Sequence, residues 1–448
     1  MTLKIKKQSI INLLFIVIIL FSIFFLRKLL IFICPILVLF FLYVFKLKLT
    51  VNQFIYLIIV AVITIISSAI EGFFIENFLF SLYLLFPLFI LITSKSKAYN
   101  EFTNQYYFHN FFSKFTILLA IVNVSAFIYS QFLITGDQNF EDSFTGLYGS
   151  SGFGSHTLSI INLMVSVYYF YSKKYFKFML FLICGILGFY GLGLMVFLLA
   201  FFLVFLSNLY KYWRTFAMVV LSGLMAAYSL YIFNPENFRY LEKNINYAQL
   251  VIDDYSYEKQ MKTANDTLIT RVPRFITFLD GSQKRFFNDP KVFLIGTSPG
   301  GYNSRVAFYF NGDFMKNKFI KNNFNNRTEY HKEDIFPLLN RKYIERPYND
   351  GTRNQTFSSL VSILLEYGFF VGGIFLFWFF SKIRRIRKKL YPHNKAQSQY
   401  VKFLGYFMFF LLLVQNYFEY SEIIFPILIL IKLMEIDHYN TIFDEPEQ

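Results

Sequence analysis

Residues 178–206 form one apolar run without a charged residue, FMLFLICGILGFYGLGLMVFLLAFFLVFL. A helix needs about 20 residues to cross the hydrocarbon core of a bilayer, and roughly 17–25 are tolerated. At 29 residues, this run is too long for one ordinary crossing. Its middle contains Gly185, Gly188, Gly191 and Gly193, where a reversal or a broken helix is easiest. The run predicts a membrane protein, and the charges around it decide how often it crosses.

The composition of the whole chain indicates that lipid is its solvent. Of the 448 residues, 56% are hydrophobic and only 16% are charged. A soluble domain is about 45–50% apolar and about 25% charged. The net charge of +15 would suit a nucleic-acid ligand, but the basic residues lie in short runs between apolar stretches, as membrane topology demands. We therefore predict an all-α polytopic membrane protein without a nucleic-acid partner.

Several apolar stretches are candidate spans: residues 10–26, 29–45, 51–70, 78–92, 115–134, 157–171, 178–206, 215–233, 356–380, 401–417 and 420–434. Lysine and arginine favour the cytoplasmic side in short loops. If 178–206 crosses twice, every basic connection lies inside, and the acidic connections 71–76 and 137–142 lie outside. A single crossing would move the basic block 382–389 outside. We therefore expect about 12 transmembrane helices and cytoplasmic termini.

One long polar segment, residues 234–355, separates two groups of spans and is extracytoplasmic on this count. The chain then divides into an N-terminal bundle (1–233) of about nine spans, the periplasmic loop, and a C-terminal part (356–448) of about three spans with a cytoplasmic tail. Within the loop, we predict a helix over 247–279 and a strand over 289–301 that ends in a glycine-proline turn. A loop this long in a compact protein is usually functional.

The large loop concentrates arginine side chains. A guanidinium is a permanently charged, planar fork that suits phosphate and pyrophosphate oxygens, although each arginine could equally form an ordinary ion pair on a solvated surface. The candidates are Arg271, Arg274, Arg285, Arg305 and Arg353. The five histidines and two cysteines show no ligand spacing, and no phosphate-binding glycine motif occurs, so we expect neither a metal ion nor a cofactor.

The span after the loop begins with a polar residue at every fourth position: Asn354, Ser358, Ser362 and Glu366. On a helix, this spacing places them in one stripe that descends from the membrane surface into the bilayer. A carboxylate in the bilayer is costly and faces a cavity or a partner, so Glu366 is a candidate for function. The alternative is that Glu366 forms hydrogen bonds inside the bundle and fixes its packing.

Three features together resemble the O-antigen polymerase and ligase superfamily of bacterial envelopes. The first is the layout, with one long periplasmic loop before the last few spans. The second is 271–275 (RVPRF) followed by 290–301 (PKVFLIGTSPGG), which is similar to the family's arginine and glycine-rich turn. The third is Asn354 leading into 364–372 (LLEYGFFVG), which is similar to the family's entry to a late helix. The layout covers the whole chain, and the motifs cover about 271–373.

The resemblance implies a glycosyltransferase of the bacterial inner membrane. It would join undecaprenyl-pyrophosphate-linked oligosaccharide repeats into O-antigen or a similar surface polysaccharide at the periplasmic face. The implied partners are that lipid-linked oligosaccharide, membrane lipid and a polysaccharide chain-length regulator. The implied site residues are Glu366, Arg271 and Arg274 for catalysis, Arg285, Arg305 and Arg353 for pyrophosphate binding, and Asn354, Gly296 and Gly300 for substrate positioning.

Two alternatives stay open. Ligases of the superfamily carry a histidine just before the asparagine, where this chain has Arg353, and this difference favours a polymerase. The first large external loop, 135–156, contains no arginine, so a scheme with two arginine-bearing loops is not supported. An oligosaccharide-lipid flippase would also have about 12 spans, but it would not need a 122-residue external loop and would be expected to show two related halves, which this sequence lacks.

Overall fold

The computed structural model describes most of the predicted bundle and part of the large loop. The described residues are 7–24, 26–71, 75–95, 107–130, 144–149, 154–188, 190–206, 262–264, 267–269, 274–310, 328–339 and 357–444, with single positions between 213 and 232. Within them the fold is helical. The strands among them form two antiparallel pairs, β1 (Leu47–Lys48) with β2 (Ser94–Lys95) and β3 (Lys262–Ala264) with β4 (Thr267–Ile269). The predicted all-α class is confirmed.

The predicted spans correspond to helices, except for 215–233, of which only single positions are described. The helices before the large loop are α1 (Lys7–Ile23), α2 (Arg27–Val44), α3 (Val51–Ile70), α4 (Ile75–Leu84), α5 (Phe89–Ile92), α6 (Tyr107–Ile128), α7 (Gly154–Tyr171), α8 (Tyr175–Leu187) and α9 (Gly191–Phe205). The later helices are α12 (Arg274–Asn288), α13 (Pro290–Ile295), α14 (Arg305–Phe310), α16 (Phe336–Leu339), α17 (Ser359–Gly368), α18 (Ile374–Leu390), α19 (Lys395–Val414) and α20 (Ser421–Asp444). Short 3-10 or π turns occur at η1 (Phe86–Leu88), η4 (Gly146–Tyr148), η7 (His331–Ile335), η9 (Phe369–Gly373) and η10 (Tyr417–Glu419).

Four helical segments among the described residues are long and apolar enough to cross a membrane. They are α3, α6, the continuous helix formed by α17, η9 and α18, and α19. A fifth forms if α4 and the helix after it, which are bent by 45° relative to each other, count as one span. Shorter apolar helices of 10–17 residues are Gln8–Ile23 in α1, Leu29–Val44 in α2, α8 and α9. By length and composition, the chain is therefore a protein with several membrane-spanning helices.

The long apolar run is broken into two helices, as its glycines predict. α8 begins beside the end of α7, where the ring centroids of Phe170 and Phe178 are 5.5 Å apart. α9 ends at the same place, where Phe205 is 5.5 Å from Phe170. Between the two helices, Tyr190 stacks on His156 at the opposite end of α7, with the ring centroids 4.5 Å apart. The run therefore traverses the length of α7 twice.

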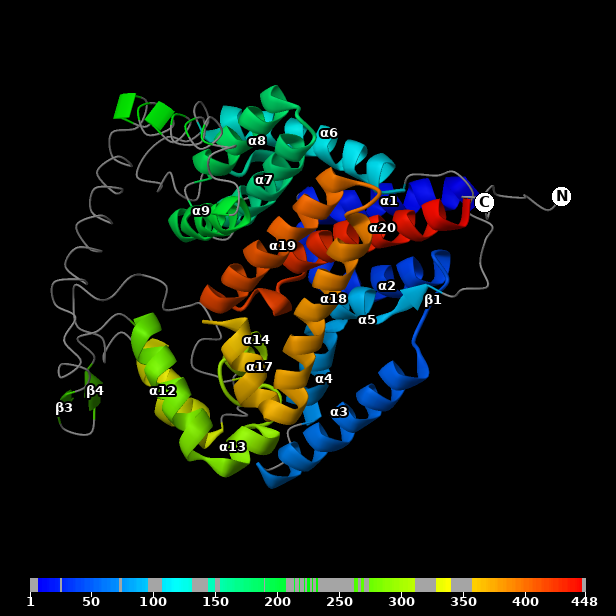
Figure 1. Cartoon of the computed structure of the whole chain (residues 1–448). Coiled ribbons are helices and arrows are strands. Elements are labelled where there is room, and N and C mark those ends of the chain that lie inside the picture. The colour runs from blue at the N-terminus through cyan, green and yellow to red at the C-terminus, as the bar shows by residue number, and fades with distance from the viewer. Residues whose placement is uncertain are drawn as a thin grey trace.

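Three of the segments predicted to be cytoplasmic, at β2, in the basic half of α18 and in α20, contact one another. Lys432 of α20 donates to the carbonyl of Thr93, beside β2, at 2.7 Å. Its neighbour Glu435 forms ion pairs of 2.8 Å with Lys432 and with Lys382, in the basic half of α18. Glu71 at the end of α3 forms an ion pair with Lys291 of the large loop. Figure 1 shows α12 and α13 on the side of the molecule away from α1 and β1.

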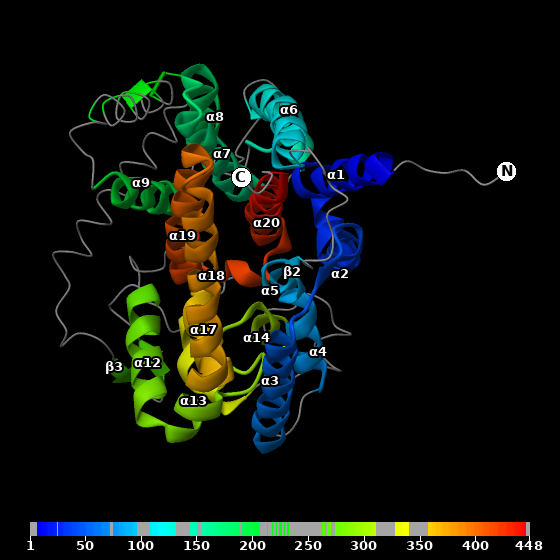
Figure 2. The same cartoon turned by 45° about the vertical axis from the view of Figure 1, so that its right-hand side comes forward.

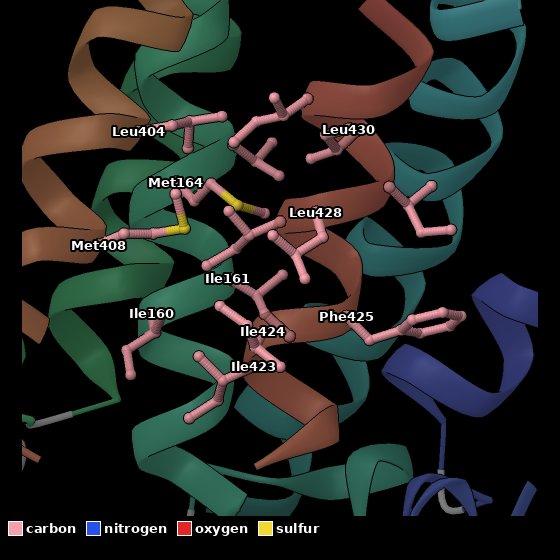
Figure 3. Packing of buried hydrophobic residues seen from close by; sticks show 14 of the residues in the cluster. Ile160, Ile161, Met164, Leu404, Met408, Ile423, Ile424, Phe425, Leu428 and Leu430 are labelled. Carbon is pink, nitrogen blue, oxygen red and sulfur yellow. The ribbon is translucent and has the colours of Figure 1, made fainter. Parts of the chain in front are cut away.

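The core of the bundle lies between α7, α19 and α20. Figure 3 shows Ile161 and Met164 of α7 facing Met408 of α19 and Leu428 of α20. The side chains of α20 are buried on all sides from residue 423 to 438. Its charged side chains are buried too: Lys432 pairs with Glu435, and Asp437 accepts the backbone N–H groups of Tyr107 and Phe108. A helix that is buried all round belongs at the centre of a bundle, so α20 forms the central helix.

The continuous helix formed by α17, η9 and α18 connects this bundle to the large loop. In Figure 2, α17 and α18 form one column whose lower end lies beside α12 and α13. Gly368 at the end of α17 has a φ of +69°, and a Cβ there would lie 2.6 Å from the carbonyl oxygen of Leu294 in α13. Only glycine therefore allows this approach of the two backbones.

Two predictions within the large loop differ from the structure. The helix predicted over 247–279 is interrupted by the strand pair β3–β4, and the helical residues described within this range are those of α12 from Arg274 onward. The strand predicted over 289–301 is the helix α13. Asp289 caps this helix by accepting the N–H of Lys291 at 3.0 Å, and Pro290 occupies the first helical position. This start signal outweighs the β-forming character of the apolar residues that follow.

Candidate functional site

The glycine-rich turn, residues 296–304, lies against α17. The N–H of Thr297 donates to the carbonyl of Leu365 at 2.7 Å. Gly296 has a φ of +82°, and a Cβ at this position would lie 2.3 Å from the carbonyl oxygen of Glu366. The turn therefore approaches the helix backbone at a distance that only glycine permits.

The carboxylate of Glu366 holds the turn in place. Its Oε2 accepts the N–H of Gly300 at 2.7 Å. Its Oε1 accepts three more backbone N–H groups, those of Tyr302, Asn303 and Ser304 at 3.1, 3.2 and 2.9 Å. The side chain is buried, and hydrogen bonds from neutral donors to a carboxylate are among the stronger ones in proteins. The structure therefore uses Glu366 to position the turn.

Of the rest of the predicted polar stripe, Ser362 contacts the same turn and Ser358 caps the helix. Ser362 accepts the side-chain N–H of Asn303 at 3.1 Å. Ser358 caps α17 by accepting the N–H of Val361 at 3.2 Å. The predicted stripe is confirmed for these two serines and Glu366, whereas Asn354 lies outside the described residues.

Arg305 lies where the turn joins α14, half-buried against η10. Its Nε donates to the hydroxyl of Tyr309 at 2.9 Å, and its Nη1 donates to the carbonyl of Glu419 at 3.1 Å. The guanidinium carbon lies 4.1 Å from the ring centroid of Tyr420, within cation–π range. The backbone N–H of Arg305 donates to the Glu419 carboxylate. Among the described residues, no partner binds Nη2, so this one amino group of the guanidinium is not engaged.

Glu419 is a buried carboxylate that the sequence analysis missed. It is 3% exposed, and its Oε2 also accepts the side-chain N–H of Asn416 at 3.0 Å. Its Oε1 has no hydrogen-bond donor within the described part of the chain. Burial raises the pKa of Glu419 to about 8; the nearby Glu366 carboxylate also raises it, and the N–H of Arg305 opposes both effects. An acidic residue in the short connection between two apolar runs was the available signal.

Arg285 is occupied by acidic side chains of the loop itself. Its Nε and Nη2 donate to the two oxygens of Asp334 at 2.8 and 2.9 Å, and Nη2 also donates to Glu333 at 2.8 Å. Its guanidinium lies 5.2 Å from the ring centroid of Tyr330. The hydrogen bond to Asp334 raises the pKa of Arg285 above its ordinary value. Arg285 thus attaches α12 to η7, and Arg305 contacts a different set of elements.

The other predicted site residues divide into two groups. Gly300 lies in the turn, where its carbonyl accepts the side-chain N–H of Asn77 at 3.3 Å. Arg274 begins α12, and its side chain is outside the described part. Arg271 and Arg353 lie wholly outside it, so their roles stay predictions. No group of three histidine, cysteine or acidic side chains that could hold a metal ion occurs among the described residues.

No protein-family model matches this sequence, and no curated protein matches it significantly.

Proposed function

We propose that this chain is a membrane glycosyltransferase that polymerises undecaprenyl-pyrophosphate-linked oligosaccharide repeats at the periplasmic face of the bacterial inner membrane. In the proposed topology, about 12 helices cross the membrane, both termini are cytoplasmic and residues 234–355 are periplasmic. A hydroxyl of the acceptor repeat attacks the anomeric carbon of the donor chain, and the carbon–oxygen bond to pyrophosphate breaks. Because pyrophosphate is a good leaving group, the protein mainly has to bind its charge and orient the acceptor.

The proposal rests chiefly on Arg305. Its guanidinium lies at the junction of the loop and the bundle, where Nε donates to Tyr309 and Nη1 donates to the carbonyl of Glu419. Nη2 is not engaged by any described residue, so its N–H groups can donate to the oxygens of pyrophosphate, which suit a permanently charged guanidinium. The turn that leads into Arg305 is fixed by the four backbone hydrogen bonds of Glu366. A cation that starts from such a rigid turn is held in place before the substrate arrives.

The other candidate residues differ in how many of their polar atoms are already engaged, and this decides which role each can take. Glu366 acts on the reaction through the turn, because its two oxygens already accept four N–H groups. Arg285 would have to exchange its two contacts with Asp334 in order to bind pyrophosphate, so it ranks behind Arg305. Arg271 and Arg353 remain candidates for the same pyrophosphate.

The proposal is tested on the surface polysaccharide of a deletion strain, separated on a gel. Without a polymerase, single repeats are still exported and joined to their lipid acceptor, so we expect a single-unit band and no ladder. The full-length gene should restore the ladder, whereas Arg305→Ala should not. Arg305→Lys keeps the charge but loses the fork, so it should restore a weaker or shorter ladder. The matched control is Arg384→Ala, at an exposed position in the basic half of α18, which should restore the full ladder.

Three outcomes would contradict the proposal. A deletion strain that also lacks the single-unit band would point to a flippase. A deletion strain that accumulates long polymer on undecaprenyl pyrophosphate would point to a ligase. If the Ala variants at positions 271, 274, 285, 305 and 353 all restored a normal ladder at normal protein levels, none of these arginines would bind pyrophosphate.

A further inference from the structure

We infer that Glu419 is the proton acceptor of the proposed polymerisation, with its Oε1 facing the hydroxyl of the acceptor sugar while Arg305 binds the leaving pyrophosphate. This inference rests on the proposed function and deepens it, because it names the residue that acts on the acceptor. The Glu419 carboxylate would then face the acceptor oxygen that receives the sugar, and the Arg305 guanidinium would face the pyrophosphate oxygen that releases it.

The first observation is the asymmetry of the Glu419 carboxylate. Oε2 is anchored by the side-chain N–H of Asn416 and the backbone N–H of Arg305. Oε1 has no donor among the described residues, so it is available to a ligand hydroxyl. A general base has to be fixed in position and also to have a free lone pair within reach of the proton, and this carboxylate meets both conditions.

The second observation is that Glu366 and two carboxylates that contact the large loop, Asp334 and Glu71, are already engaged. Glu366 accepts four backbone N–H groups. Asp334 is bound by Arg285 at 2.8 Å, and Glu71 forms an ion pair with Lys291. Glu419 contacts Arg305 through a backbone N–H and a backbone carbonyl, so its charge is not cancelled by a direct ion pair.

The environment of Glu419 suits proton transfer near neutral pH. The charged and titratable groups that interact with it are Glu366 and Tyr367 of α17, Arg305 of α14 and the adjacent Tyr420. Burial is the main reason why the pKa of Glu419 rises to about 8. A general base works best when its pKa lies near the working pH, because it is then both available and basic enough.

The proposed step is balanced in atoms and charge. The acceptor hydroxyl gives its proton to Oε1 of Glu419 as its oxygen bonds to the anomeric carbon of the donor. The bond from that carbon to the pyrophosphate oxygen breaks, and the electron pair leaves on undecaprenyl pyrophosphate beside the guanidinium of Arg305. Glu419 returns the proton to water before the next addition.

The test uses full-length protein in membranes and the lipid-linked single repeats extracted from the deletion strain. Glu419→Gln keeps an oxygen that can accept the N–H of Arg305, but its amide is not a base. We expect its polymerisation rate to fall by about 10²–10⁴-fold. Undecaprenyl pyrophosphate should still raise the thermal stability of Glu419→Gln as it does for the wild type, and Arg305→Ala should lose this effect. The matched control is Glu329→Gln, whose exposed side chain pairs with Lys332, and its rate should stay within about twofold of the wild type, as for surface changes away from a site.

The pH profile separates a base from a packing residue. The wild-type rate should rise as the pH increases through about 8, because Glu419 ionises over this range. Glu419→Asp retains a carboxylate and should keep a pH-dependent rate with a shifted midpoint, and it serves in place of the glutamine variant if that variant does not fold. A wild-type rate in Glu419→Gln would overturn the inference, and so would a variant that loses both its rate and its stabilisation by undecaprenyl pyrophosphate. Either result would leave the polymerase proposal intact, whereas a deletion strain with an unchanged ladder would contradict the polymerase proposal itself.

Discussion

Replacing Glu366 by glutamine isolates the contribution of one carboxylate oxygen to the glycine-rich turn. Oε1 accepts three backbone N–H groups, so the amide oxygen of glutamine is expected to take that place. The amide nitrogen then faces the N–H of Gly300, which is 2.7 Å from Oε2 in the wild type. Two donors cannot bond to each other, so this hydrogen bond is lost. A hydrogen bond to a charged group contributes about 1.5–3 kcal/mol, and we expect the turn to open more easily by that amount.

Amide hydrogen exchange measures this opening directly. Because about 1.4 kcal/mol corresponds to a tenfold change in an equilibrium constant, amides in 296–304 should exchange about 10- to 150-fold faster in Glu366→Gln. The exchange is followed by mass spectrometry on the peptide that covers the turn, with the full-length protein in detergent. Glu422→Gln removes a charge from α20 without touching the turn and should leave the exchange of this peptide unchanged.

Two results would refute this reasoning. Equal exchange of the turn peptide in Glu366→Gln and the wild type would show that the carboxylate does not hold the turn. Faster exchange spread equally over α17 and α19 would show that the substitution destabilises the whole bundle instead. In the polymer assay, a loosened turn displaces Arg305, so we expect a shortened or absent ladder with the single-unit band kept. An unchanged ladder would separate Glu366 from function.

Three further predictions follow from single contacts. Gly296→Ala places a Cβ 2.3 Å from a carbonyl oxygen at a φ of +82° and should destabilise the protein by about 2–4 kcal/mol. Gly281→Ala, in the interior of α12 with nothing within 4 Å of the added Cβ, should stabilise the protein by about 0.5–1 kcal/mol. Thermal unfolding in detergent compares the two variants, and equal effects would contradict the close approach at Gly296. Reporter fusions should be cytoplasmic after Lys389 and extracytoplasmic near Thr328, and an extracytoplasmic signal after Lys389 would contradict the count of about 12 spans. Burial raises the pKa of Glu419 from its ordinary value of 4.5 to about 8, so the folded protein binds an extra proton between these pH values. The free energy of unfolding should therefore fall as the pH rises from 4.5 to about 8, and Glu419→Gln should lack this pH dependence. Identical pH profiles of stability for the wild type and Glu419→Gln would contradict the raised pKa.

Local pattern was enough to predict most of the helices, and its failures have identifiable causes. Hydropathy located nearly every helix of the bundle because a backbone in lipid must satisfy its own hydrogen bonds, which a helix does within one segment. The mistaken strand at α13 arose because the apolar residues were weighed more heavily than the cap formed by Asp289 and Pro290. A short helix in a loop is decided by its first residues, and the apolar run after them is equally compatible with a strand.

The amino-acid sequence by itself determined that the protein is a helical membrane protein, that its longest apolar run is broken at the glycines, and that a polar stripe descends from Ser358 to Glu366. Only the tertiary structure decided what these groups contact. Glu366 binds N–H groups 62 to 66 residues earlier in the chain, and Arg305 meets a carboxylate 114 residues later. Such partners depend on how helices that are distant in sequence pack together, and the local periodicity of the sequence does not predict them. The same packing left one oxygen of Glu419 open, which singles out a residue that no motif had indicated.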